Sequence, residues 1–233
     1  MQILSQFLVS DIDEPAANHF LDDHERTAII PLGAIRHYGS KIPIGLDTKI
    51  TQHICETGLQ LATTPDGRRA GLVFPAITFN LDEKLIGALT VSAETMAHVM
   101  ADAILAIRHQ GFARTIIATS DPDLVPLTRV KQLLDLADDH PVFVVPTYSP
   151  DSSDNDVVED PEEHRLSETM LSLGMYLLPD QDWGSLVEME AEAALNQLLG
   201  TSTFVASRYK GGQLMNLYAQ RFAEYVTALN HQS

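Results

Sequence analysis

The chain has 233 residues, of which 45 % are hydrophobic, enough for the core of one domain spanning residues 1–233. Its 15 Lys and Arg stand against 32 Asp and Glu, giving a formal charge of −17, which excludes nucleic acid and anionic membrane surfaces as default partners. The single cysteine, Cys55, excludes a disulfide within the chain and a zinc site built from cysteines.

Short apolar runs alternate with amphipathic segments along the chain. The apolar runs predict strands at residues 27–32, 70–74, 114–119 and 141–146, with a shorter strand at 203–206. Helical periodicity predicts helices at residues 48–61, 92–110, 121–137, 164–173, 186–199 and 213–229. This alternation predicts a three-layer α/β/α fold with a mostly parallel, doubly wound sheet.

The helix predicted at 92–110 has the clearest boundaries. Ser92 is a favoured N-cap residue, and Glu94 places a negative charge in the first turn. Gly111 is expected to end the helix in the left-handed conformation.

Residues 33–47 read GAIRHYGSKIPIGLD and follow the first predicted strand. In order and spacing this run is similar to a motif of the creatininase (creatinine amidohydrolase) family, GSTEQHGPHLPLGTD, with the same glycines, proline and final aspartate. Further landmarks of that family recur in order: FPA at 74–76, GALTVS at 87–92, GFAR at 111–114 and, more loosely, HRLSET at 164–169. The resemblance covers residues 27–179 and implies the creatininase fold.

The chain departs from this family where the family holds its metals. The first motif of the family supplies a Glu, a His and an Asp as ligands, and these positions correspond to Arg36, Tyr38 and Asp47. After the third predicted strand the family has Asn-Gly-His, whereas this chain has Thr-Ser-Asp, ending at Asp121. A guanidinium does not deprotonate in proteins, so Arg36 cannot become a ligand. We expect it to replace the metal charge and to pair with Asp47 or Asp121; the alternative is that it points to solvent.

The candidate site residues fall into three groups. Three carboxylates are candidate ligands of a weakly bound Mg²⁺, Mn²⁺ or Zn²⁺: Asp47, Asp121 and Asp123. The alternative is that they bind no metal and serve at helix starts as caps. The catalytic candidates combine groups that move protons or donate hydrogen bonds: His37, Tyr38, His164 and Glu168. Two basic residues are predicted to bind substrate: Arg36 and Lys41.

Two functions remain open. The resemblance implies an amidohydrolase that acts on a small-molecule amide or a related C–N bond, here with a degenerate metal site. The alternative is a non-catalytic relative that binds a small molecule or serves as a subunit of an assembly. The family also implies homo-oligomers, often hexamers. The single cysteine and the absence of a secretory signal pattern at residues 1–7 fit a cytoplasmic protein.

Overall fold

The computed structural model describes residues 7–21, 27–36, 42–62, 69–81, 85–134, 140–148, 168–181, 183 and 206–230. Its strands are β1 (Thr27–Gly33), β2 (Leu72–Val73), β3 (Ile77–Thr78), β4 (Asn80–Leu81), β5 (Thr90–Val91), β6 (Arg114–Thr119) and β7 (Val142–Pro146). Its helices are α1 (Glu14–Leu21), α2 (Leu46–Leu61), α3 (Ala93–His109), α4 (Leu127–Leu134), α5 (Glu168–Leu177) and α7 (Arg208–Asn230). The 3-10 turns are η1 (Val9–Asp11) and η2 (Pro122–Leu124).

The main sheet is parallel, with the strand order β2-β1-β6-β7 and with β3 continuing beside β1. All seven residues of β1 are buried, as expected for a strand covered on both faces. Pro31 lies within β1 and pairs with Ala118 of β6 on one side. On the other side of β1 the partner strand is β2 before Pro31 and β3 after it. A proline, which lacks a backbone N–H, fits this break between two short partners.

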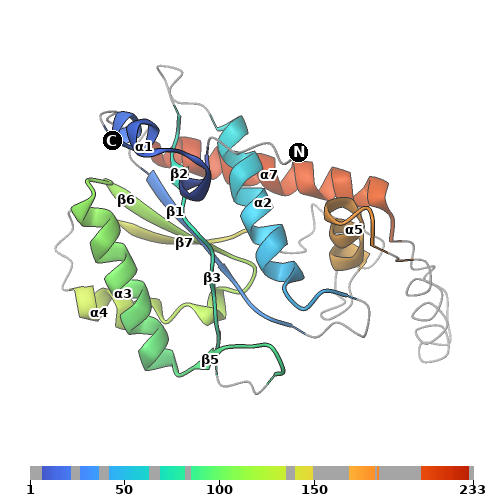
Figure 1. Cartoon of the computed structure of the whole chain (residues 1–233), viewed down its shortest axis with the longest axis horizontal. Helices are drawn as coiled ribbons and strands as arrows, with labels where there is room; N and C mark the ends of the chain where they lie inside the picture. The colour runs from blue at the N-terminus through green and yellow to red at the C-terminus, as the bar shows by residue number, and fades with distance from the viewer. Residues whose placement is uncertain are drawn as a thin grey trace.

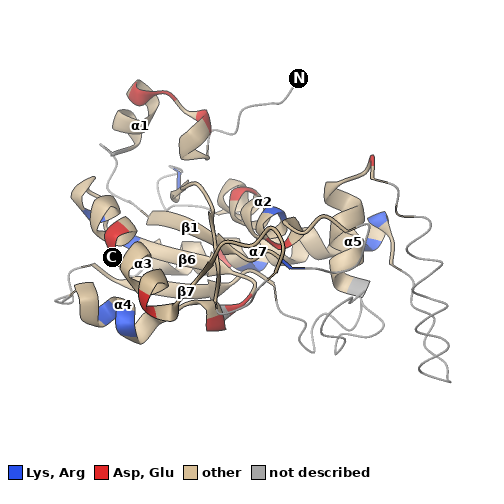
Figure 2. Cartoon of the chain, turned by 60° about the horizontal axis from the view of Figure 1, so that its bottom comes forward, with Lys and Arg blue, Asp and Glu red and all other residues tan. Residues whose placement is uncertain are grey.

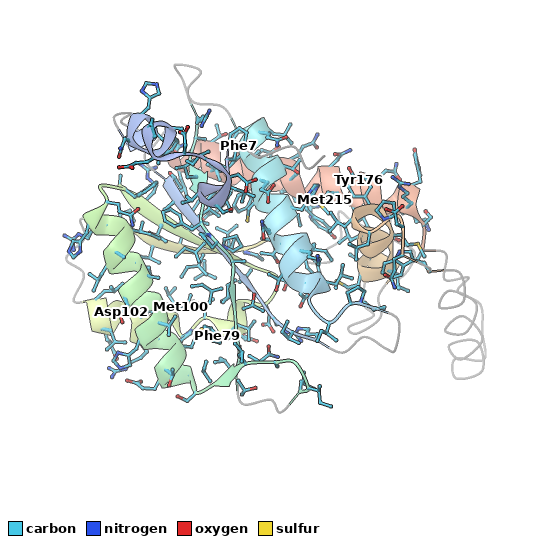
Figure 3. The ribbon with its side chains drawn as sticks, viewed as in Figure 1. Phe7, Phe79, Met100, Asp102, Tyr176 and Met215 are labelled. Carbon is cyan, nitrogen blue, oxygen red and sulfur yellow. The ribbon has the colours of Figure 1, made fainter. Side chains whose placement is uncertain are left out.

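Helices cover both faces of the sheet and form a three-layer structure (Figure 1). One apolar cluster joins α2, α5 and α7 to the sheet, and a second joins α3 and α4 to the opposite face. Ile29 belongs to the first cluster and its neighbour Ile30 to the second, because successive side chains of a strand point to opposite faces. Met215 on α7 and Met100 on α3 lie in these two layers (Figure 3). The predicted α/β/α fold is therefore confirmed.

Charged residues are distributed over several elements of the described structure. Figure 2 shows acidic residues on α1 and η1 and basic residues on α4. Among the described helices, none combines the length and the apolar character that crossing a membrane requires.

Several predicted boundaries are confirmed. The strand at 114–119 matches β6, and Ser92 caps α3 by accepting a hydrogen bond from the backbone N–H of Thr95 at 3.1 Å. Gly111 has a φ of 93°, the left-handed conformation expected after this helix. Cap chemistry and β-branched composition were thus sufficient to place these elements.

The helix predicted at 121–137 was wrong at its start. Residues 122–124 form the turn η2, and α4 begins only at Leu127. Pro126 is the reason, since a proline disfavours helical geometry in the residue before it. The C=O of Pro126 instead accepts the first helical bond, from the N–H of Val130 at 2.9 Å.

The last helix was predicted to start too late. It was placed at 213–229, but α7 begins at Arg208 and includes Gly211 and Gly212. Glycine disfavours helix by itself, but here it permits close packing of α7 against α5. A Cβ on Gly211 would lie 1.8 Å from the carbonyl oxygen of Ser172. The helix predicted at 164–173 ends too early, because α5 runs from Glu168 to Leu177, while residues 164–167 lie outside the described residues.

Two further predicted elements cannot be compared with the structure. The helix at 186–199 and residues 203–205 of the strand at 203–206 lie outside the described residues. Ala206 is described and stands just before α7 without strand geometry.

Candidate functional site

Polar side chains gather where three parallel strands of the sheet end. Arg36 follows β1, Asp121 follows β6 and Tyr148 follows β7, while Asp47 lies in the first turn of α2. Loops at the carboxyl ends of parallel strands lie at the same edge of a sheet, where ligands bind in open α/β folds. The loops that carry Asp47 and Asp121 meet there through Arg36, as the sequence predicted.

Arg36 and Asp47 form an ion pair at this edge. The Nε atom of Arg36 lies 3.1 Å from Oδ2 of Asp47, in the geometry of an ion pair rather than of a well-directed hydrogen bond. The Asp47 side chain is 1 % exposed, whereas that of Arg36 is 35 % exposed. Asp47 is the second residue of α2, so the positive end of the helix dipole also favours its negative charge. The helix-capping role considered for Asp47 is wrong, because the N-cap residue is Gly45.

Arg36 also pairs with Asp121. Its Nη2 contacts Oδ2 of Asp121, whose side chain is 29 % exposed. The other carboxylate oxygen, Oδ1, accepts a hydrogen bond from the backbone N–H of Asp123 at 3.1 Å. Asp121 therefore both stabilises the turn η2 and binds the guanidinium. The expected pairing is confirmed, whereas the helix that Asp121 was expected to cap begins only at Leu127.

Tyr148 completes the contacts around Asp47. Its hydroxyl donates a hydrogen bond of 2.9 Å to Oδ1 of Asp47. The hydroxyl oxygen of Tyr148 also lies 2.8 Å from Sδ of Met170. The carboxylate is the stronger acceptor, because hydrogen bonds to ionised groups exceed those to a thioether sulfur. Asp47 is thus held from two sides, by the charge of Arg36 and by the hydroxyl of Tyr148.

The backbone around Arg36 is fixed by a buried amide. Asn80, 3 % exposed, accepts a hydrogen bond from the N–H of Ile35 at 2.9 Å and donates one to the C=O of Ile35 at 2.8 Å. The N–H of Arg36 donates to the C=O of Ile44 at 2.9 Å. The direction in which the Arg36 side chain leaves the loop is therefore set by Asn80 and by the loop before α2.

Sequence reasoning missed Asn80 and Tyr148. Asn80 lies outside the family landmarks, in a stretch with little regular pattern. A signal for Tyr148 was present, because it stands two residues beyond β7, a strand parallel to β6 and ending at the same edge.

The structure places only part of the predicted site. Four candidates lie outside the described residues: His37, Tyr38, Lys41 and His164. Glu168 begins α5, and its side chain is not among those described. Asp123 is exposed on η2 and contributes its N–H to Asp121. The residues brought together are Arg36, Asp47 and Asp121.

The described residues at this edge do not fit a divalent cation. In the described part of the chain, His, Cys, Asp and Glu side chains form no group of three or more that could hold a metal ion. The guanidinium of Arg36 contacts both Asp47 and Asp121, so a cation between them would face a fixed like charge at short range.

Burial shifts the pKa values of three groups farther along α2. Desolvation lowers the pKa of His53 and raises the pKa of Glu56, where a hydrogen bond from Gln52 partly offsets the shift. Burial also raises the pKa of the Cys55 thiol well above its ordinary value, and the negative charge of Glu56 adds to this effect. Cys55 lies eight residues beyond Asp47, about 12 Å along the helix axis, so these groups do not belong to the Arg36 site.

Known proteins share this architecture. No curated protein matches the sequence. A creatinine amidohydrolase (creatininase) structure has a TM-score of 0.72 at 16 % identity, with 94 % of this chain and 96 % of that chain covered. A protein from Bacteroides fragilis NCTC 9343, provisionally assigned as a creatinine amidohydrolase, has a TM-score of 0.78 at 15 % identity, with 98 % of both chains covered. A structure described as creatininase Mn has a TM-score of 0.71 at 15 % identity, covering 94 % of this chain and 97 % of that one.

At these identities the structural likeness shows the fold alone. The family itself is shown by sequence, because the family model described as creatinine amidohydrolase matches residues 11–169, more than half of the chain. The order of landmarks read from the sequence and this match agree, and the chain belongs to the creatininase family.

Proposed function

We propose that this chain binds a small amide-type molecule at the Arg36 site and has exchanged the two-metal chemistry of its family for a fixed guanidinium. The observation that carries the proposal is the double contact of Arg36 with Asp47 and Asp121. The positive charge that a metal would supply is provided at this edge by the protein itself.

The chemistry of the guanidinium supports binding rather than water activation. A bound divalent cation lowers the pKa of water and so generates hydroxide near neutral pH, which a guanidinium does not do. A guanidinium is instead a planar donor that recognises carbonyl and carboxylate oxygens. About a third of the Arg36 side chain is exposed, so a ligand oxygen can approach it from solvent.

A second candidate function is an amidohydrolase that acts on a small-molecule amide or a related C–N bond. The observation that favours it is that two carboxylates, Asp47 and Asp121, remain within reach of one common group. In that case a weakly bound Mg²⁺, Mn²⁺ or Zn²⁺ would have to displace Arg36. The resemblance would then assign proton transfer to His164, with Glu168 to orient it.

Turnover and binding measured on the same preparation separate these candidates. Creatinine and a panel of small cyclic and linear amides are the substrates to assay, with and without added Mn²⁺. The binding function predicts no turnover above the buffer rate and saturable binding of at least one amide, lost in Arg36→Gln. Lys49→Gln is the matched control, since Lys49 is an exposed cation on α2. Metal-dependent turnover by the wild-type protein would contradict the binding function and support the hydrolase.

Domain organisation and assembly are part of the same proposal. Residues 1–233 form a single domain in it, and copies associate as a homo-oligomer in the cytoplasm. Exposed apolar side chains in the turn before β5 support association, since Ile86 is 86 % and Leu89 is 67 % exposed. Light scattering on the purified chain should give a mass above 25.6 kDa, and a monomer at micromolar concentration would refute the oligomer.

A further inference from the structure

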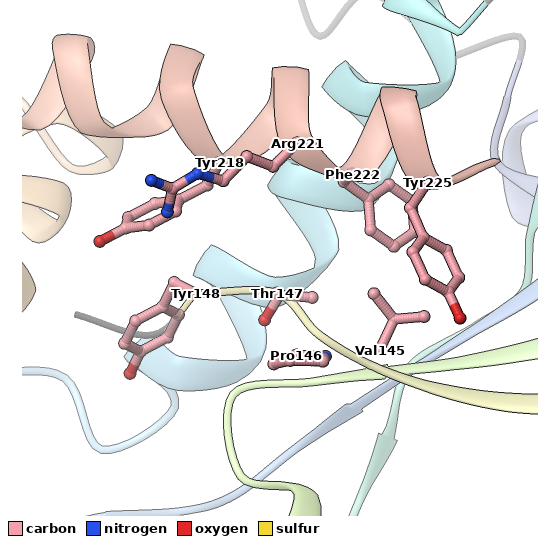
Figure 4. A pocket seen from close by; sticks show the side chains of 8 residues that line it. All are labelled: Val145, Pro146, Thr147, Tyr148, Tyr218, Arg221, Phe222 and Tyr225. Carbon is pink, nitrogen blue, oxygen red and sulfur yellow. The ribbon is translucent and has the colours of Figure 1, made fainter. Parts of the chain in front are cut away.

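A pocket lined in part by Tyr148 lies apart from the Arg36–Asp47 pair. It is a pocket of about 330 Å³ between the end of β7 and the helix α7 (Figure 4). The β7 side contributes Thr147 and Tyr148, and the α7 side contributes Tyr218, Arg221 and Tyr225. Its volume falls at the lower end of the range for small-molecule sites.

Half of the residues that line this pocket are aromatic. The rings of Tyr148 and Tyr218 lie 6.0 Å apart at 50°, and Phe222 and Tyr225 lie farther along the pocket (Figure 4). Tyr218 and Phe222 are almost fully buried and hold their positions, whereas Tyr225 is 38 % exposed. Flat, rigid walls of this kind favour a planar ligand, which can contact several rings at once.

One cation stands among these rings. The guanidinium of Arg221 lies 5.8 Å from the centre of the Tyr218 ring and lines the same pocket. Arginine binds a carboxylate through two parallel hydrogen bonds, and such bonds are strongest where nearby apolar groups exclude water. Thr147 on the opposite wall is buried, and its hydroxyl lies 3.3 Å from that of Thr51.

We infer that this pocket binds a small planar carboxylate, with its aromatic body packed against the tyrosine rings and its carboxylate on Arg221. This inference is separate from the function proposed for Arg36, because none of its contacts uses Arg36, Asp47 or Asp121. An aromatic monocarboxylate of the size of benzoate or indole-3-acetate fits the volume.

Tyr148 connects the two sites. Its ring lines the pocket, while its hydroxyl donates to Asp47.

The test is calorimetric titration of the full chain with benzoate and with indole-3-acetate. Benzamide is the neutral comparison, because it keeps the ring and lacks the charge. We expect saturable binding of a carboxylate at low millimolar concentration or below, and binding of benzamide weaker by at least about tenfold. Arg221→Met, which keeps the length of the side chain, should weaken carboxylate binding by at least about tenfold.

Matched variants locate the site. Arg208→Met removes an exposed cation from the same helix and should leave binding unchanged. Arg36→Ala should also leave it unchanged, so failure of the Arg36 proposal does not affect this result. If Arg221→Met does not fold, NMR signals of the ring hydrogens of tyrosine decide instead, with Tyr148 and Tyr225 expected to shift on benzoate addition. Absence of saturable binding, equal binding of benzamide, or full binding by folded Arg221→Met would overturn the inference.

Discussion

Arg36 places its Nε atom 3.1 Å from Oδ2 of Asp47, a carboxylate that is only 1 % exposed. Such a buried carboxylate without a compensating charge would cost several kcal/mol, on the order of what is measured for broken buried pairs. The Tyr148 hydroxyl and the first turn of α2 stabilise the same charge, but neither is a full positive charge. The Arg36–Asp47 pair is therefore expected to be a structural requirement of this edge of the sheet.

Arg36→Ala should destabilise the protein by about 1–3 kcal/mol, between the values for exposed and for fully buried pairs, because Arg36 is one third exposed. Chemical denaturation measures this change. Lys49→Ala, on the exposed side of α2, should change the free energy of unfolding by less than about 0.5 kcal/mol. Asp47→Asn should relieve much of the loss when it is combined with Arg36→Ala. Equal stability of Arg36→Ala and the wild type would mean that the guanidinium does not compensate Asp47.

Tyr148→Phe should destabilise the chain by about 1–2 kcal/mol, because it removes a hydrogen bond to a buried carboxylate. Tyr225→Phe is the comparison, since Tyr225 is more exposed and should tolerate the loss of its hydroxyl. The effect of Tyr148→Phe should shrink when Asp47 is already Asn. An undiminished effect in that background would show that the hydroxyl acts through Met170 or another group.

Gly211→Ala and Gly212→Ala form a matched pair on α7. A Cβ on Gly211 would lie 1.8 Å from the backbone oxygen of Ser172, so this variant should lose about 1–3 kcal/mol through overpacking. A Cβ on Gly212 would lie 3.3 Å from the ring of Tyr176, which can move, and alanine favours helix. Thermal unfolding should therefore show a large decrease for Gly211→Ala and little change for Gly212→Ala. The reverse order would place the close contact of α5 and α7 elsewhere.

Cys55 should make stability depend on alkaline pH. Burial raises the pKa of its thiol, so the folded chain retains the proton above pH about 8.5, where the unfolded chain releases it. The free energy of unfolding should then fall as pH rises above that value, by at most about 1.4 kcal/mol per pH unit for one group. The free energy of unfolding of Cys55→Ala should fall less steeply over the same pH range. Fast reaction of the native thiol with a thiol reagent near pH 8 would contradict its burial.

Much of the fold followed from local chemistry. The strand at 114–119 is apolar and β-branched, and α3 has both a capping Ser92 and a terminal Gly111, so composition located the strand and cap residues located the helix. Local chemistry failed where long-range packing decides. The start of α7 runs through Gly211 because Ser172 of α5 lies against it, and a contact between residues 39 positions apart has no local signature.

The candidate site was likewise predicted in part from the sequence. Pairing of Arg36 with Asp47 or Asp121 was predictable, because the family motif indicated which loops meet and the buried carboxylate required a partner; that Arg36 contacts both was not predicted. The second support of Asp47 was not predicted, because Tyr148 belongs to a loop more than 100 positions away in the sequence. Asn80 likewise acts through the backbone of Ile35, and a backbone contact of this kind leaves no pattern of residue types.

In the proposed function, the guanidinium of Arg36 takes the place of the family's metals. Elemental analysis of the chain, purified without chelator and dialysed against metal-free buffer, tests it most directly. Arg36→Glu combined with Tyr38→His is the positive control, because it restores two ligand types of the family motif beside Asp47, and it should take up Zn²⁺ or Mn²⁺. For the wild-type chain we expect zinc and manganese far below one equivalent; one or two equivalents per chain would show that Arg36 has not replaced the metals.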